Sequence, residues 1–348
     1  MYKYILGIES SCDETSAAVV EDGKKLLSNV VASQISTHAR YGGVVPEVAS
    51  RMHVESILPV IEEALETAGV TFDDIGGIAV TQGPGLIGSL LVGLASAKTI
   101  AFSLGKPLLG VNHLEAHISA VHLENDVEFP FIALIASGGH TNLYIVHGHT
   151  DFVPISKTRD DAAGEAFDKA AKVLDLGYPG GVMIDKLAKT GDKEKHSFPI
   201  PFNTKKSYDF SFSGIKTSLV YFLKKNEVEG EQDLKDICAG YQESIVKSLL
   251  NKTFNAANEN GIKRVVFCGG VACNSRLREL GKEYGEKNGI EIFYPSPSLC
   301  TDNAAMIAVL GYHRFIEGSI SELNISAYST LKTRIVRGQD SFSTNQDS

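Results

Sequence analysis

Apolar residues in the first third of the chain gather in short runs that are separated by small polar turns. The runs YILGIE and SAAVVEDG read as two strands around the turn SSCDET, and ESILPVIEEALETAG has the apolar spacing of a helix ending at Gly69. DDIGGIAVTQGPG and KPLLGVNH read as further strands, each followed by a helix. This alternation predicts an α/β fold with parallel-sheet character.

The same order of elements begins again at Phe129. FPFIALIASGGHTNLYIVHG predicts two strands around the turn SGGHT, and RVVFCGG and EIFYPS predict two later strands. Helices are expected around Ala239 to Asn258, from near Asn274, and over DNAAMIAVLGYHRFIEG. Two lobes that each open with a hairpin favour a duplicated nucleotide-binding architecture. We expect an N-terminal lobe, a C-terminal lobe whose last helix could pack back on the first, and a disordered tail, over residues 1–112, 113–330 and 331–348.

The longest apolar stretch, LIGSLLVGLASAKTIAFSLG, is long enough to suggest a membrane span. Lys98 lies inside it with several Ser and Gly residues, and a central charge is costly in lipid. We interpret it as a buried helix of a protein that does not enter a membrane. The start of the chain, MYKYILGIESS, lacks the apolar run of a secretory signal.

Composition agrees with a soluble two-lobed protein, because 348 residues are too many for one typical core. The formal net charge of −9 argues against a surface coated by nucleic acid, so an RNA partner would need a local basic patch or a second protein. The five cysteines form no CxxC pair, which indicates a reducing cytoplasm rather than a disulfide framework or a zinc ribbon.

The stretch VNHLEAHISA places His113 and His117 four residues apart, on one face of a predicted helix. Two imidazoles in this arrangement could bind one cation, or could simply form a polar helix surface. A zinc protease would need a glutamate directly after the first histidine, whereas the acid here is Glu115, near the opposite side. Asp302, close to a predicted helix start, could cap that helix or complete a His/His/Asp set suited to iron or zinc.

Small residues form turns at three strand ends, where exposed backbone N–H groups could meet a phosphate. Two are Ser10 to Asp13 and Ser137 to Gly139, and each could equally be an ordinary turn. The third follows Gly269 and Gly270, with Asn274 or Ser275 suited to cap the next helix.

Asp168 lies in the block DDAAGEAFDKAAKVLDLGYPGG, whose acids would mostly be solvated on a helix surface. It differs from them because its neighbours are apolar and a Gly-rich turn follows at Gly180 and Gly181. A role in binding is therefore open for this carboxylate.

Nine segments together resemble the bacterial TsaD family, in the family's order over roughly residues 4–315. They are GIESSCDETSAAVV, GGVVPEVASRMH, QGPGLIGSLLVGLASAK, NHLEAH, SGGHT, DDAAGEAFDKAAKVLDLGYPGG, FSFSGIKT, GGVACNSRLR and CTDNAAMIA. The resemblance implies an α/β, two-lobed fold of the actin, sugar-kinase and heat-shock-ATPase class, with a duplicated mixed-sheet core and a central cleft. It also implies an acyltransferase that moves the threonylcarbamoyl group of threonylcarbamoyl-AMP to the exocyclic amine of the adenosine 3′ of the anticodon, in tRNAs reading codons that begin with A.

The resemblance further implies which residues form the site. The metal, Fe²⁺ or Zn²⁺, would be held by His113, His117 and Asp302. The nucleotide would contact Ile135, Ala136, Ser137, Gly138, Gly139, Asp168, Gly181, Asp185 and Asn274. Archaeal relatives carry a tyrosine ligand just before the Ser-Gly-Gly turn, where this chain has Ile135, so we expect substrate oxygens or water to complete the metal shell.

An aromatic amine is a poor nucleophile, so a carboxylate that takes its proton would help the transfer. Asp13 and Glu14 are our candidates, although both could instead orient the hairpin. The resemblance implies tRNA as acceptor and two protein partners, the paralogous subunit TsaB, docked on the N-terminal lobe, and the small ATPase TsaE. Two other functions stay open, an ATP-dependent small-molecule kinase of the same fold and a non-catalytic nucleotide-binding subunit.

Overall fold

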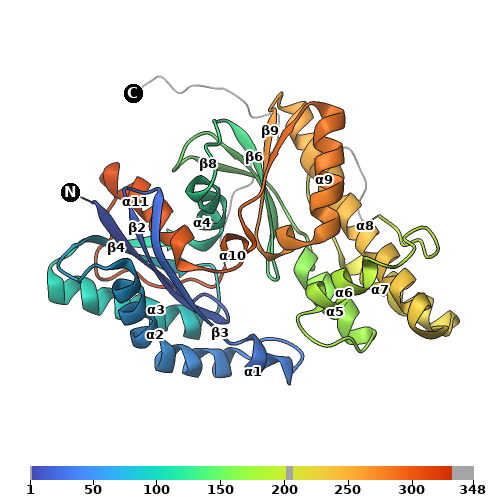
Figure 1. The fold of residues 1–348 in the computed structure, drawn as a ribbon, viewed down its shortest axis with the longest axis horizontal. Coiled ribbons are helices and arrows are strands. Elements are labelled where there is room, and N and C mark those ends of the chain that lie inside the picture. The colour runs from blue at the N-terminus through green and yellow to red at the C-terminus, as the bar shows by residue number, and fades with distance from the viewer. Residues whose placement is uncertain (1, 201–206, 331–348) are drawn as a thin grey trace.

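Two five-stranded sheets organise the chain (Figure 1), and the computed structural model describes residues 2–200 and 207–330. The first sheet contains β1 (Tyr4–Glu9), β2 (Glu14–Glu21), β3 (Lys25–Ser33), β4 (Ile75–Gly83) and β5 (Leu108–Asn112). Its strand order is β3-β2-β1-β4-β5, with β1 antiparallel to β2 and parallel to β4. The predicted opening hairpin is therefore confirmed.

The second sheet repeats this arrangement with β6 (Phe131–Ala136), β7 (Thr141–Val146), β8 (Phe152–Lys157), β9 (Arg264–Cys268) and β10 (Glu291–Phe293). Its order is β8-β7-β6-β9-β10, which matches the first sheet strand for strand. The central strand β6 is antiparallel to β7 and parallel to β9, as β1 is to β2 and β4. The prediction of a duplicated mixed-sheet core is confirmed.

Helices cover both faces of the first sheet. Along β1, Leu6 packs in the core beneath α2 (Pro46–Ala68) and α3 (Ile87–Leu104), and the preceding Ile5 packs on the other face with α11 (Ala304–Ile316). Successive strand residues point to opposite faces, which explains this division. The last described helix thus lies with the N-terminal strands (Figure 1), although it follows the second sheet in the sequence.

Two glycines allow α11 to lie close against the first sheet. A Cβ on Gly7 would meet the backbone oxygen of Ala304 at 2.3 Å, and a Cβ on Gly311 would meet Cβ of Ala79 at 2.4 Å.

The division into lobes at residues 112 and 113 stays a prediction, and residues 331–348 lie outside the described residues.

Helix α3 contains the long apolar stretch that was interpreted as a buried helix. Among the described residues it is the one helix long and apolar enough to cross a membrane by length and composition alone. One face is buried through residues such as Leu94, while Leu91 and Phe102 are exposed, and Lys98 Nζ donates to the Ile325 carbonyl. The interpretation therefore holds for one face of the helix only, because α3 covers the sheet from a single side.

Further helical segments lie between β5 and α11 in the sequence, and several of them supply residues to the walls of a cleft. They are α4 (His113–Ser119), η1 (Ala120–Leu123), α5 (Ala163–Val173), α6 (Gly180–Ala188), α7 (Ser213–Lys225), α8 (Gly230–Glu259), η2 (Gly270–Cys273), α9 (Ser275–Asn288) and α10 (Pro297–Cys300). A short helix, α1 (Ile35–Ala39), follows β3 in the first half. The expected helix around residues 239–258 is the second part of α8, whose 30 residues include many that are buried.

Candidate metal centre and nucleotide cleft

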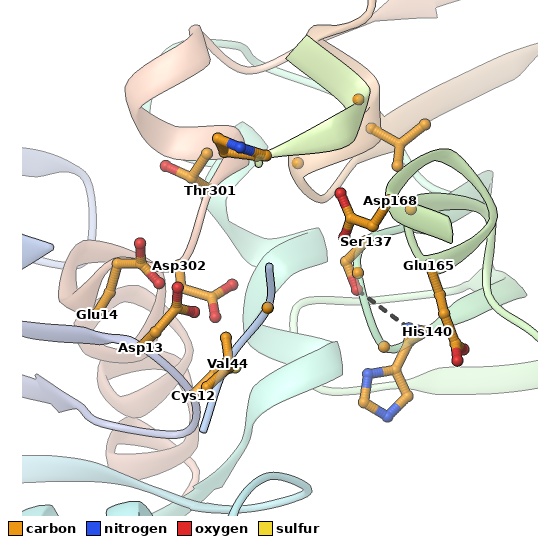
Figure 2. A pocket seen from close by; sticks show the side chains of 18 of the residues that line it. Cys12, Asp13, Glu14, Val44, Ser137, His140, Glu165, Asp168, Thr301 and Asp302 are labelled. Carbon is orange, nitrogen blue, oxygen red and sulfur yellow. Dashed lines mark hydrogen bonds between the residues drawn. The ribbon is translucent and has the colours of Figure 1, made fainter. Parts of the chain in front are cut away.

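A cleft of about 1060 Å³ lies where the ends of β1 and β6 face one another. The loops that follow both strands line it, as do the start of α6, the η2 segment and the residues just before α11. Figure 2 shows Asp13, Glu14 and Asp302 on one side of the cleft, with Ser137 and Asp168 on the other. Ligands of α/β proteins commonly bind beyond the carboxyl ends of the strands, which is the place this cleft occupies.

The structure brings His113, His117 and Asp302 together, with one ligand atom from each within 4.8 Å of the others. Nε2 of His117 lies 3.1 Å from Asp302 Oδ1, and Nε2 of His113 lies 3.6 Å from the same oxygen. Both histidines are on α4, whose first turn is fixed by the Asn112 side chain accepting from the N–H of Leu114. Two imidazole nitrogens and a carboxylate oxygen form a donor set that suits a transition metal with open positions.

Glu9 holds His113 in the orientation that this donor set needs. Its Oε2 lies 2.9 Å from His113 Nδ1, so the Nε2 atom points toward Asp302. The Glu9 side chain is completely buried and also accepts from the Thr81 hydroxyl and the Ser11 N–H. A carboxylate on the far nitrogen of a histidine fixes the ring and its tautomer in many metal sites, so these residues fit a metal ion.

Electrostatics also favour a cation at this position. Burial opposes protonation of His113, but the carboxylates of Glu9 and Asp302 outweigh burial and raise its pKa to about 9. Burial would raise the pKa of Asp302, yet the two histidines hold it below its usual range. The buried carboxylate of Glu9 and the partly buried one of Asp302 thus create a negative site that a proton or a metal ion can neutralise.

Asp302 is not a helix cap, so one of its two expected roles is wrong. The next residue, Asn303, caps α11 by accepting from the N–H of Met306 at 3.2 Å. Glu115 pairs with Arg314 and Asn112 and does not line the cleft. Glu115 is therefore not placed to act as a base at the histidine pair, as the sequence indicated.

The turn after β6 has the open space that a phosphate would need. Ser137 and His140 close the turn, with the Ser137 N–H donating to the His140 carbonyl at 2.8 Å. A Cβ on Gly138 or Gly139 would meet no atom within 4 Å, although both residues line the cleft.

Ile135 and Ala136 belong to β6, with side chains that are buried and do not line the cleft. They precede the turn in the sequence, and their side chains point into the core. A nucleotide in the cleft could therefore contact only their backbone atoms.

The other four expected nucleotide contacts, Asp168, Gly181, Asp185 and Asn274, all line the cleft, and the three side chains among them have protein partners. The Asp168 carboxylate accepts a hydrogen bond from the N–H of Gly180. Burial raises the pKa of Asp168, although this hydrogen bond lowers it. Gly180 and Gly181 are the first residues of α6 rather than a turn.

The remaining two side chains are tied to the start of α9. Asp185 accepts from the Ser275 hydroxyl at 2.7 Å, while Asn274 caps α9 through the N–H of Leu277 and donates to Gln242. The expectation of a cap at Asn274 is confirmed. The same bonds that anchor Asp185 and Asn274 to α9 fix their positions in the cleft wall.

Asp13 and Glu14 lie at the end of the first hairpin turn, near Asp302 in the cleft (Figure 2). Burial, followed by the charges of Asp13 and Asp302, raises the pKa of Glu14 to about 9, although the Ser33 hydroxyl donates to its Oε1 at 3.0 Å. Glu14 therefore holds a proton at neutral pH in the metal-free protein.

Two residues of the site were missed in the sequence, Glu9 behind His113 and His140 in the wall of the cleft. Glu9 could have been found, because a single charge at the end of the apolar strand YILGIE must be paired when it is buried. His140 lines the cleft, and burial followed by the charges of His113 and His117 lowers its pKa to about 4. No sequence pattern indicated its position near the histidine pair.

Known structures share this fold at low sequence identity. Full-length HypF in the phosphate- and nucleotide-bound form has a TM-score of 0.63 at 15% identity, covering 91% of this chain and 56% of HypF. Component A of the (R)-2-hydroxyglutaryl-CoA dehydratase of Acidaminococcus fermentans has a TM-score of 0.53 at 20% identity, covering 89% and 98%. These likenesses confirm the predicted two-lobed, actin-like fold class and carry no argument about activity.

Sequence comparison identifies the family. The TsaD model, described as tRNA N6-adenosine threonylcarbamoyltransferase, matches residues 25–309. A protein of that name from Syntrophus aciditrophicus (strain SB) is 58% identical over 327 residues, covering 93% of this chain and 96% of the relative. Another, from Geotalea uraniireducens (strain Rf4), is 53% identical over 340 residues, covering 96% and 99%. The chain whose cleft joins a His/His/Asp cluster to a Ser-Gly-Gly turn therefore belongs to the TsaD family of tRNA N6-adenosine threonylcarbamoyltransferases.

Proposed function

We propose that this protein transfers the threonylcarbamoyl group of threonylcarbamoyl-AMP to the exocyclic amine of the adenosine directly 3′ of the anticodon, in tRNAs that read codons beginning with A. The observation that carries the proposal is the meeting of His113, His117 and Asp302 beside the Ser137 turn, in one cleft of a TsaD family member. A small-molecule kinase or a non-catalytic nucleotide-binding subunit would have no use for this convergence of ligands.

The cleft supplies separate places for the two ends of the adenylate. Backbone N–H groups of Gly138 and Gly139 meet the phosphate, and Asp168 and Asp185 accept hydrogen bonds from ribose hydroxyls. A divalent iron or zinc ion bound by His113, His117 and Asp302 would polarise the oxygens of the donor. These contacts hold the activated carbonyl in place for the incoming amine.

The transfer itself exchanges one bond for another. The adenosine amine attacks the carbamoyl carbon, the bond from that carbon to the phosphate oxygen breaks, and AMP leaves with the electron pair. The amine must lose a proton, and we assign its uptake to the carboxylates of Asp13 and Glu14, which line the cleft beside Asp302.

The experiment combines the purified protein and its partners with carbon-labelled threonylcarbamoyl-AMP and unmodified tRNA, with and without a chelator. Label should enter tRNA, disappear with the chelator and return with Fe²⁺ or Zn²⁺. A double variant, His113→Ala with His117→Ala, should lose turnover and keep its partners. Glu115→Gln, outside the cleft, serves as the matched control and should keep turnover. Absence of label with every partner present would overturn the proposal, and ATP consumption would then test the kinase alternative.

We also propose that TsaB docks on the first sheet's helices and that TsaE joins the complex in the cytoplasm. Val54 and Leu58 on α2 and Ile87 and Leu91 on α3 support this surface, because all four are exposed, apolar and one helical turn apart in each pair. Leu58→Asp should abolish co-elution with TsaB in gel filtration. A partner that stays bound to this variant would place the contact elsewhere.

A further inference from the structure

The segment that follows α1 brings an exposed aromatic ring to the edge of the cleft. Gly42, Gly43 and Val44 line the cleft, and Tyr41, which directly precedes them, is 50% exposed. The guanidinium group of Arg40 lies over the Tyr41 ring, 5.1 Å from its centroid. A flat apolar surface and a positive charge thus lie next to each other beside the cleft.

The buried side chain of His38 holds this segment in place. Its Nδ1 accepts from the N–H of Val45 at 3.3 Å, and its backbone carbonyl accepts from the N–H of Tyr41 at 2.9 Å. Its Nε2 lies 3.2 Å from Oε1 of Gln34, whose backbone N–H donates to the Asp13 carbonyl at 3.0 Å. The segment is therefore anchored to the first hairpin turn and needs little ordering before a ligand binds.

Arg40 keeps its charge free for a ligand. Its Nε donates to the Thr37 carbonyl at 3.2 Å, and its guanidinium group forms no ion pair within the part of the chain that the structure describes. The two other exposed arginines of that part, Arg51 and Arg159, each pair with a carboxylate. In a chain with a formal net charge of −9, a free guanidinium group beside the cleft favours a negatively charged ligand.

Space for a nucleotide chain lies next to the ring. A Cβ on Gly42 or Gly43 would meet no atom within 4 Å, although both residues line the cleft. A strand of nucleotides could therefore pass from the Tyr41 ring into the cleft over glycine backbone, without meeting a side chain at these two positions.

We propose that Tyr41 and Arg40 form a stacking platform for a nucleotide of the anticodon loop, next to the adenosine that enters the cleft. The inference rests on the proposed function, which requires this adenosine to leave the stack of bases. Its neighbour then loses a stacking partner, and the Tyr41 ring replaces it while Arg40 contacts a phosphate. Asp13 and Asp302 make the cleft itself negative, so RNA needs a positive contact at its edge.

Tyr221 on α7 provides a matched comparison. It is 60% exposed, and Lys224 Nζ lies 5.9 Å from its ring centroid, so it also combines an aromatic ring with a cation. All residues of α7 are described, and none of them lines the cleft. The place of Tyr41 beside the cleft is therefore what distinguishes the two tyrosines.

The first test uses the absence of tryptophan from the chain. Tyr41→Trp places a single fluorescent indole beside the cleft, and Tyr221→Trp places one on α7 as the control. An unmodified anticodon stem-loop RNA should quench the first by stacking and leave the second unchanged, and an RNA duplex of equal length should quench neither. Equal quenching in both variants, or none in Tyr41→Trp at any RNA concentration, would overturn the proposal.

The second test measures binding of unmodified tRNA to the protein with its partners present. Tyr41→Ala should weaken binding by about tenfold, whereas Tyr41→Phe and Tyr221→Ala should keep it. Arg40→Gln should reduce the slope of log affinity against log salt concentration by about one. AMP binding and the melting temperature should stay unchanged in all four variants, which separates lost stacking from misfolding.

The outcomes separate this inference from the proposed function. If Tyr41→Ala transfers the threonylcarbamoyl group with an unchanged KM for tRNA, the platform is wrong and the transferase stands. If the stem-loop quenches Tyr41→Trp but the unmodified chain transfers no label, the platform stands and the transferase reaction fails. A Tyr41→Ala variant that binds tRNA normally and loses a protein partner would make this surface a protein contact and overturn the inference.

Discussion

Glu9 and Ala136 occupy the same place in the two halves of the molecule, and their difference separates the chemistry of the two halves. Each is the last residue of its central strand, each is buried, and each pairs with the neighbouring antiparallel strand, through Ser16 and Thr141. Glu9 is a carboxylate that holds His113, whereas Ala136 leads into the uncharged turn after β6. The repeated strand order places both turns at the ends of central strands. The residue at the end of each strand then differs, so that the first half suits a cation and the second half suits a phosphate.

The strongest way to break this contrast is to remove the carboxylate that faces the histidine pair. Asp302→Asn should lower bound metal to background and reduce transfer by about a thousandfold, because an amide oxygen is a weak, uncharged ligand. Metal analysis and the labelled-tRNA assay measure the two effects. Glu115→Gln should change neither, and full metal occupancy in Asp302→Asn would contradict the assignment of the donor set.

A smaller effect is expected when Glu9 itself is made neutral. Glu9→Gln keeps the size of the side chain and weakens its bond to His113 Nδ1, so metal affinity should fall by about 10- to 100-fold. Competition with a chromophoric chelator measures this affinity without an activity assay. Unchanged affinity would show that His113 binds metal without help from Glu9. The difference between Glu9 and Ala136 would then not explain the metal site.

On the phosphate side, two glycines that lie close together should respond differently to alanine. Gly138→Ala places its methyl in open space, so it should leave the melting temperature unchanged and weaken AMP binding by crowding the cleft. Gly164→Ala would bring Cβ to 2.6 Å from the Ser137 oxygen, which should destabilise the fold by about 1–3 kcal/mol. Calorimetric binding and thermal melts distinguish the two. A strong loss of stability in Gly138→Ala would show that the turn needs this glycine for folding and not only for binding.

The smallest expected effect concerns the proton on Glu14. Its pKa is raised to about 9 in the fold, so burial favours the neutral form, and the associated stability is lost as pH rises from the unfolded pKa toward about 9. In chelated protein, Glu14→Gln should therefore raise the melting temperature at pH 8 and give no comparable gain at pH 4. Parallel melts at the two pH values measure this difference. A larger gain at low pH would have the wrong sign.

Much of this arrangement could be predicted from hydrophobic spacing. The hairpins around SSCDET and SGGHT, the helix that ends before Gly69 and the cap at Asn274 depend on local sequence, and all four are confirmed. The convergence of His113 with Asp302 could not be obtained in this way, because 189 residues separate them. It depends on the return of α11 to the first sheet, which the family resemblance anticipated through the ligand set.

Other features depend on contacts that no local pattern reveals. Asp302 could have been a cap, and only the structure shows that the neighbouring Asn303 fills that role. The exposed face of α3 could not be predicted from composition, since apolar residues are spread around most of the helix.

The packing of α11 against Gly7 also determines when the N-terminal half can finish folding during synthesis. The first strands leave the ribosome early, but one face of their sheet stays uncovered until residues 304–316 have been made. Folding of the N-terminal half must therefore await almost the last part of the chain, a long-range dependence that slows folding. Because Asp302 arrives with this helix, the donor set for the metal is assembled last, and a nascent chain cannot capture the ion with all three ligands before its architecture is finished.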